Sequence, residues 1–115
     1  MGKRIDEFDE FRTTMNERIL GEGTLDTKRF FALDSAVYRD GAVPARTKEM
    51  LGLVASMVLR CNDCISYHVI ECNKAGVTAA ELAEVFDVAL IVGGSIVIPH
   101  VRHARAVLDE LEAEK

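Results

Sequence analysis

Tryptophan is absent from the sequence, proline occurs twice, and aromatic side chains make up only 6% of the 115 residues. An excess of basic residues is also missing, because 14 Lys and Arg face 19 Asp and Glu, which gives a net charge of −5. Nucleic acids and anionic membranes are bound through basic surfaces. The charge balance therefore predicts that neither is the main partner of this protein.

No hydrophobic run is long enough to cross a bilayer. The longest apolar stretch, residues 88–99, is shorter than the roughly 20 residues of a spanning helix and contains Gly93 and Gly94. The N-terminal sequence MGKRIDEFDEF is charged and acidic, unlike a targeting signal with its basic patch and apolar run. We therefore expect a soluble, cytoplasmic protein, and its length predicts a single domain over residues 1–115.

Apolar residues recur every three or four positions near the N-terminus, which is the spacing of one helical face. The first set comprises Ile5, Phe8, Phe11, Met15 and Ile19. Gly21 and Gly23 predict the end of this helix. A second helix is expected over residues 26–39. Its inward-facing side chains are predicted to be Phe30, Leu33 and Val37.

Two further helices precede residue 77. Pro44 suits the first turn of a third helix, which is apolar almost all round after Glu49. Such a helix belongs in a core or in an oligomer interface. A fourth helix is expected from Asn62 to Gly76.

The remaining helices have clear start signals. Thr78 and Glu81 form a capping box that predicts a fifth helix over residues 79–92. After the Gly93-Gly94 break, Ser95 can cap a last helix that has Pro99 in its first turn. The apolar seam of this helix comprises Val97, Val101, Ala104, Leu108 and Leu111. With no convincing strand pattern, the sequence predicts an all-α domain of about six helices.

Cysteine is confined to one short segment. Residues 61–72 read CNDCISYHVIEC and hold all three cysteines of the chain. In a reducing cytosol, a pair such as Cys61 and Cys64 is more often redox-active or metal-binding than a permanent disulfide. This segment is therefore the first candidate for a functional site.

Cys61, Cys64 and His68 are spaced three and four residues apart, so on a helix they share one face. Cys61 falls at the expected helix start, where backbone N–H groups and the helix dipole favour a thiolate. His68 lies one turn beyond Cys64, within reach of its thiol proton directly or through one water. The spacing therefore supplies a nucleophile, a base, and a second thiol that can resolve a sulfenic acid into a disulfide.

Metal binding and inert packing remain alternatives for the same segment. A structural zinc site needs four converging ligands, and this helical face supplies three at most. Cys72 is three turns from Cys61, about 16 Å along the helix axis, so one ion cannot bind both. A zinc ion would need a ligand from elsewhere, such as His100 or His103, and we expect no metal and no cofactor.

Several of these residues also have ordinary structural interpretations. Cys72 taken alone is expected to be a small buried apolar residue. His68 taken alone would be interpreted as a structural histidine with its hydrogen bonds satisfied, and only its spacing from Cys64 suggests a role in the site. His100 and His103 are interpreted as ordinary residues in the first turns of the last helix.

Between residues 44 and 95 the sequence combines several features of one family. Glu49 lies twelve residues before the first cysteine, and the pattern Cys-X-X-Cys-X-X-X-His is followed by Ala-Gly-Val-Thr and then by Gly-Gly. Together these features resemble the alkylhydroperoxidase D / carboxymuconolactone decarboxylase family over about residues 43–106. The first 40 residues show no match. The resemblance implies an all-α fold that assembles into rings, commonly trimers of dimers.

The resemblance also implies a role for each motif residue. Cys64 matches the cysteine that meets the peroxide, and Cys61 matches the resolving cysteine. His68 matches the histidine that takes the proton from Cys64, and Glu49 matches the glutamate that assists Cys61 through water. By position alone, Glu49 is either a solvated acid of the first helical turn or a partly buried carboxylate that could act as a base.

One position departs from the family pattern. The alkylhydroperoxidase branch carries a histidine just before the second cysteine, and here that position is Asp63. A carboxylate cannot relay a proton near pH 7 as an imidazole does, and its charge raises the pKa of neighbouring thiols. Asp63 therefore argues against an efficient peroxidase and leaves disulfide reductase or sensor chemistry open.

Two apolar segments predict self-association. Residues 50–59 and 88–98 hold more apolar surface than a 115-residue monomer readily buries, and an oligomer would cover it. With the resemblance, this predicts a homo-oligomer, either a trimer or a hexamer.

Taken together, the sequence predicts a thiol-dependent peroxidase or disulfide oxidoreductase that reduces hydroperoxides in antioxidant defence. Its expected partners are a hydroperoxide or disulfide substrate and a reducing thiol/disulfide protein. One alternative is a non-redox, decarboxylase-like enzyme with His68 and Glu49 as acid and base. Another is a non-enzymatic helical scaffold or zinc-binding module.

Overall fold

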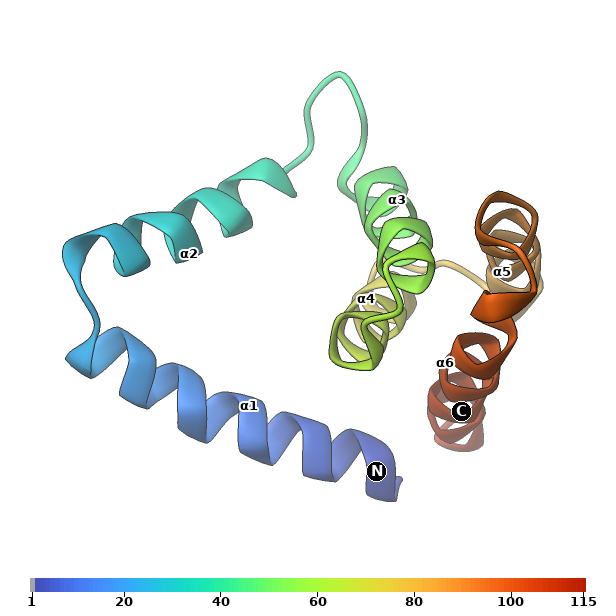
Figure 1. The fold of residues 1–115 in the computed structure, drawn as a ribbon, viewed down its shortest axis with the longest axis horizontal. Coiled ribbons are helices and arrows are strands. Elements are labelled where there is room, and N and C mark those ends of the chain that lie inside the picture. Colours follow the sequence, from blue (N-terminus) through green and yellow to red (C-terminus); the bar gives the residue numbers. More distant parts are fainter. Residues whose placement is uncertain (1) are drawn as a thin grey trace.

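Residues 2–115 are described by a computed structural model, and every regular element within them is a helix (Figure 1). The elements are α1 (Lys3–Glu22), α2 (Leu25–Val37), α3 (Ala45–Val58), α4 (Asn62–Lys74), α5 (Ala79–Gly93), a short 3-10 helix (Ser95–Val97) and α6 (Ile98–Ala113). The predicted all-α class with six helices is thereby confirmed. None of these helices combines the length and the apolar character needed to cross a membrane.

Most predicted helix ends agree with the structure because their signals are local, although Gly21 lies inside α1 and does not end it. Gly23 follows α1, and Gly76 follows α4 with a φ of 85°, a left-handed conformation that suits glycine. Two predictions at helix starts are wrong in detail. Pro44 occupies the N-cap position, one residue before α3, and does not lie in its first turn. Ser95 opens the 3-10 helix and does not cap α6, which begins at Ile98.

The core lies among α3, α4, α5 and α6. Helix α3 packs against α4 and α5, and α4 packs against α6. The core side chains from these helices include Leu53, Met57, Ile65, Val69, Leu82, Phe86, Val107 and Leu108. The predicted seam of the last helix is confirmed, with Val101 half-buried and its other members buried.

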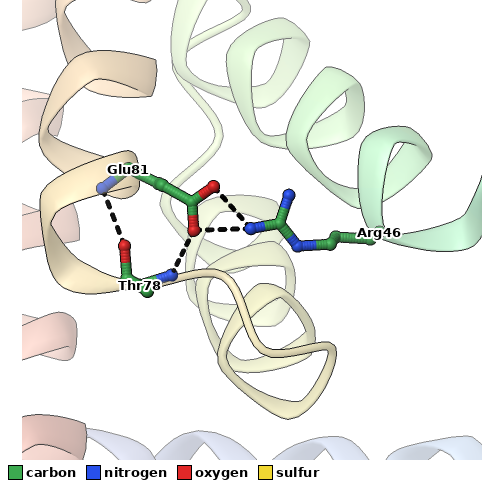
Figure 2. Close-up of polar contacts among 3 residues, drawn as sticks. All are labelled: Arg46, Thr78 and Glu81. Atoms are coloured by element: carbon green, nitrogen blue, oxygen red, sulfur yellow. Dashed lines mark hydrogen bonds and ion pairs between the residues drawn. The ribbon is translucent and has the colours of Figure 1, made fainter.

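A polar contact fixes the start of α5 against α3. Thr78 and Glu81 form the predicted capping box, in which each side chain accepts a hydrogen bond from the other residue's backbone N–H. Figure 2 shows Arg46 reaching from α3 to the Glu81 carboxylate. The guanidinium of Arg46 holds the pKa of Glu81 at about 2, below the ordinary value of 4.5.

Helices α1 and α2 extend to one side of the other four and join at the end farthest from them (Figure 1). The start of α1 is held against α6, because the backbone N–H groups of Arg4 and Ile5 donate to the Glu110 carboxylate. Ile5 is buried, but Phe11 of the predicted apolar face is 68% exposed.

Helix α2 has no buried residue. The predicted inward side chains Phe30, Leu33 and Val37 are all exposed, so that prediction is wrong for the single chain. Their helical spacing was identified correctly, but in the described chain no other helix covers the face they share.

Candidate functional site

The turn between α3 and α4 determines where Cys61 lies. The N–H of Cys61 donates to the Ser56 carbonyl (3.0 Å), and the N–H of Arg60 donates to the Met57 carbonyl (3.1 Å). This pair of hydrogen bonds is a Schellman motif, which ends a helix with one left-handed residue. Here that residue is Arg60, with a φ of 61°. The motif reverses the chain sharply and places Cys61 directly at the start of α4.

Cys61 caps the N-terminus of α4 with its own sulfur. Its Sγ accepts a hydrogen bond from the backbone N–H of Cys64 (3.3 Å). Cys61 is half-buried, Cys64 is exposed, and both are free thiols. The exposed sulfur therefore belongs to Cys64, one turn into the helix, and the second thiol lies beside it.

The Cys64 thiol holds its proton tightly in this state. Although the residue is exposed, partial desolvation of its thiol raises the pKa of Cys64 to about 11, with further contributions from the hydrogen bond to Cys61 and from negative charge on Cys61 and Asp63. The expected effect of Asp63 on a neighbouring thiol is confirmed in direction. At neutral pH this thiol is protonated, so its reaction as a thiolate requires a base.

His68 is paired with Glu49 inside the protein. The His68 Nδ1 lies 2.8 Å from Glu49 Oε2, and each side chain is only 10% exposed. A carboxylate only accepts hydrogen bonds, so Nδ1–H donates and Nε2 is left as the free ring nitrogen. Burial of Glu49 excludes the interpretation as a solvated acid.

The direct hydrogen-bond partner of Glu49 is His68, a contact that the family resemblance did not name. The implied role of Glu49 toward Cys61 through water stays a prediction. The two residues are 19 positions apart on packed helices, so no local spacing could indicate the contact. The nearest indication in the sequence was that Glu49 is the last charged residue before the apolar part of its helix.

Three residues that sequence reasoning missed surround the His68 ring. Tyr67 meets it edge-on, with ring centroids 5.1 Å apart, and Tyr38, the residue directly after α2, approaches to 5.5 Å. Gly52 lies against the ring, since a Cβ there would be 2.6 Å from His68 Cε1 and 2.8 Å from Nε2. Only glycine leaves room for the imidazole in this position.

Cys64 and His68 line one cavity of about 280 Å³. Helix α4 also contributes Asp63 and Tyr67 to its wall. The other lining side chains come from α1, from α2 and from the residue directly after α2, and they are Phe8, Arg12, Asn16, Asp34 and Tyr38. The N-terminal part of the chain therefore forms one side of the site.

The remaining candidates lie away from this cavity. Cys72 is fully buried, as expected, and burial raises its pKa to about 12. His103 Nε2 contacts Ser66 Oγ (2.7 Å), and His100 Nδ1 contacts Asn62 Oδ1 (2.8 Å), so both histidines link α6 to α4. Within residues 2–115, no three His, Cys, Asp or Glu side chains converge as a metal site would require.

Comparison with known sequences places these features in a family. A sequence model of the carboxymuconolactone decarboxylase family matches residues 27–110. The match begins 16 residues before position 43, so the expectation that the first 40 residues match nothing is wrong. Uncharacterized protein 4 of the cox locus of Paracoccus denitrificans is 34% identical over 83 residues, which cover 72% of this chain and 75% of that protein.

Solved structures share the whole fold. A protein of Thermotoga maritima is 56% identical, with a TM-score of 0.91 over 94% of this chain and 95% of that one. A second crystal structure of the same protein assigns it to this family, and a role in the antioxidative response has been suggested for it. A family member from Legionella pneumophila has the same fold at 24% identity, with a TM-score of 0.87 over 95% of this chain and 97% of that one. The present chain belongs to the carboxymuconolactone decarboxylase family.

Proposed function

We propose that this protein is a thiol-dependent peroxidase or disulfide oxidoreductase with Cys64, Cys61, His68 and Glu49 as its catalytic residues. The observation that carries the proposal is the single cavity shared by the exposed Cys64 thiol and His68. The Cys61 sulfur lies against the backbone of Cys64, and Glu49 orients the imidazole. A nucleophile, a resolving thiol and an oriented base are the groups that two-cysteine chemistry requires.

The proposed reaction begins with loss of the Cys64 proton. His68 accepts this proton at Nε2 while Glu49 stabilises the imidazolium that forms. The Cys64 thiolate attacks the distal oxygen of a hydroperoxide, the O–O bond breaks, and the leaving alkoxide takes the proton to become an alcohol. Cys64 is then a sulfenic acid, oxidised by two electrons.

Cys61 completes the oxidative half of the cycle. Its thiol attacks the Cys64 sulfur, a disulfide forms, and the sulfenic oxygen leaves as water. A dithiol protein then reduces the bridge by thiol–disulfide exchange and is itself oxidised. We place the cycle in the cytoplasm, where the reducing pool keeps such a partner available. The antioxidative role suggested for the Thermotoga maritima relative is consistent with this chemistry.

The proposal is tested by single cysteine substitutions. Cys64→Ser should abolish hydroperoxide turnover in the presence of a dithiol. Cys61→Ser should still react once but accumulate sulfenic acid at Cys64, detectable with a dimedone probe. Cys72→Ala is the matched control and should turn over hydroperoxide as the unmodified protein does, because Cys72 is buried away from the cavity and alanine adds no polar group to the core. Full turnover in both Cys64→Ser and Cys61→Ser would overturn the mechanism.

One alternative has a specific observation in its favour. The buried Glu49–His68 pair is an acid–base unit that does not need a thiol. A decarboxylase-like activity built on it would survive alkylation of Cys61 and Cys64, whereas the redox activity would be lost. A scaffold or zinc-binding module would instead retain stoichiometric zinc or leave both thiols unreactive in the folded protein.

We further propose that the protein is a homo-oligomer, a trimer or a hexamer. Large apolar side chains on α2 and near the C-terminal end of α5 remain uncovered in the single chain. They include Leu25 (60% exposed), Phe30 (69%), Leu33 (60%), Ile91 (85%) and Val92 (65%). Exposed apolar surface of this extent is typical of an interface between subunits. Light scattering coupled to size exclusion should give three or six times the mass of the chain, and a monomeric mass would contradict the proposal.

A further inference from the structure

Among the described residues, Arg12 is the only arginine or lysine in the wall of the cavity that holds Cys64 and His68. It projects from α1, and its guanidinium carbon lies 4.6 Å from the centre of the Tyr67 ring. Tyr67 in turn meets His68 edge-on. The cation is therefore held at a defined position relative to the base of the proposed reaction.

The charge of Arg12 has no anionic partner in the described chain. Among residues 2–115, its guanidinium forms no hydrogen bond and no ion pair. Arg18, six residues later on the same helix, pairs with Glu22. Asp34 and Asp63 line the same cavity as Arg12, yet neither is close enough to pair with it. The planar donor face of Arg12 is thus available to a ligand.

The rest of the wall indicates which ligand would fit. Asn16, one helical turn after Arg12, adds a second polar side chain on the same side of the cavity. Phe8 and Tyr38 supply apolar surface. The volume of about 280 Å³ greatly exceeds the ~30 Å³ share of one water molecule, so hydrogen peroxide would fill little of it.

We propose that Arg12 is a substrate-binding residue that selects organic hydroperoxides carrying a carboxylate. The carboxylate pairs with the guanidinium, and the apolar body of the substrate lies against the aromatic side chains. Asp34 and Asp63 repel an anion elsewhere in the cavity, so the carboxylate has one favourable position. This position leaves the peroxide end of the molecule for Cys64. The inference rests on the proposed peroxidase function for its chemical step, but not for its binding step.

The first test compares two hydroperoxides that differ only in charge. Rates of thiol oxidation are measured with cumene hydroperoxide and with its para-carboxylate. The unmodified protein should prefer the carboxylate by about fivefold, the size expected of an exposed ion pair. The preference should shrink with added salt and fall to near one in Arg12→Met. Arg12→Lys should keep part of it, since a lysine retains the charge without the planar donor geometry.

A matched control and a redox-independent measurement complete the design. Arg18→Met changes an exposed arginine of the same helix outside the cavity and should leave the rate ratio unchanged. Binding of 4-isopropylbenzoate, which cannot oxidise a thiol, is followed by NMR against the neutral 4-isopropylbenzamide. It should be lost in Arg12→Met and kept in Arg18→Met. If neither hydroperoxide oxidises the protein, the proposed function fails while the benzoate still decides the role of Arg12. A preference that persists in Arg12→Met, or benzoate binding no tighter than that of the amide, would overturn the inference.

Discussion

Gly52 gives the sharpest test of how His68 is positioned. It lies inside α3, where replacing glycine by alanine ordinarily stabilises a helix by about 1 kcal/mol. Here the added Cβ would lie 2.6 Å from His68 Cε1 and 2.8 Å from the Tyr38 hydroxyl. Carbon atoms in contact are separated by about 3.5 Å or more, so the imidazole must move by roughly 1 Å.

This displacement has a predictable effect on the reaction. The ring is bound by Glu49 on one side and flanked by Tyr67, so it cannot shift without lengthening the Nδ1 hydrogen bond or turning Nε2. A misplacement of about 1 Å in a reacting group costs on the order of 100-fold in rate. Gly52→Ala should therefore slow oxidation of Cys64 by hydroperoxide 10- to 100-fold while the helices remain folded.

The assay is single-turnover loss of thiol after mixing with a hydroperoxide, with circular dichroism and thermal unfolding on the same samples. Gly21→Ala is the matched control, because Gly21 also lies in a helix and an added Cβ there meets no atom within 4 Å. It should be at least as stable as the unmodified protein and equally active. An unchanged rate in Gly52→Ala, or imidazole NMR signals of His68 that do not move, would refute the positioning of His68 described above.

Further substitutions address the other charges of the protein. Glu49→Gln keeps the shape of the His68 contact but removes its charge. Because hydrogen bonds to charged groups are stronger than neutral ones by about 1–1.5 kcal/mol, Cys64 oxidation should slow about tenfold in stopped-flow measurements. An unchanged rate would contradict this role of Glu49. Asp63→Asn removes a charge that raises the pKa of Cys64, so the pH midpoint of Cys64 alkylation should move to lower pH. A midpoint at the same or a higher pH would be inconsistent with that cause. Because the folded-state pKa of Glu81 is depressed from 4.5 to about 2, its stabilising effect is present above about pH 4.5 and is lost as the pH falls toward 2. Between pH 4.5 and 2, the melting temperature of the unmodified protein should fall more steeply with decreasing pH than that of Glu81→Gln. Parallel plots of melting temperature against pH would disprove this linkage.

The features that sequence predicted well are those with local causes. The capping box of Thr78 and Glu81 and the glycine after α4 act within a few residues, so their signals are complete in a short window. The common face of Cys64 and His68 is equally local, because it follows from helical spacing alone. The buried state of Cys72 followed from its apolar character.

The features that sequence did not predict depend on which surfaces meet. Periodicity identified the apolar face of α2 but could not show that it stays uncovered in the single chain. The Glu49–His68 contact joins two helices, and Arg12 reaches the cavity from a third. Gly52 matters only because an imidazole from α4 lies against it, and nothing in its own neighbourhood of the sequence signals that approach.

The most direct measurement is the intact mass of the protein after reaction with one equivalent of hydroperoxide, with peptide mapping of the three cysteines. The proposed chemistry predicts a loss of two hydrogens, mapped to a bridge between Cys61 and Cys64 and reversed by a dithiol, with Cys72 still reduced. Thiols that remain fully reduced, or a bridge that involves Cys72, would contradict a redox centre at the start of α4.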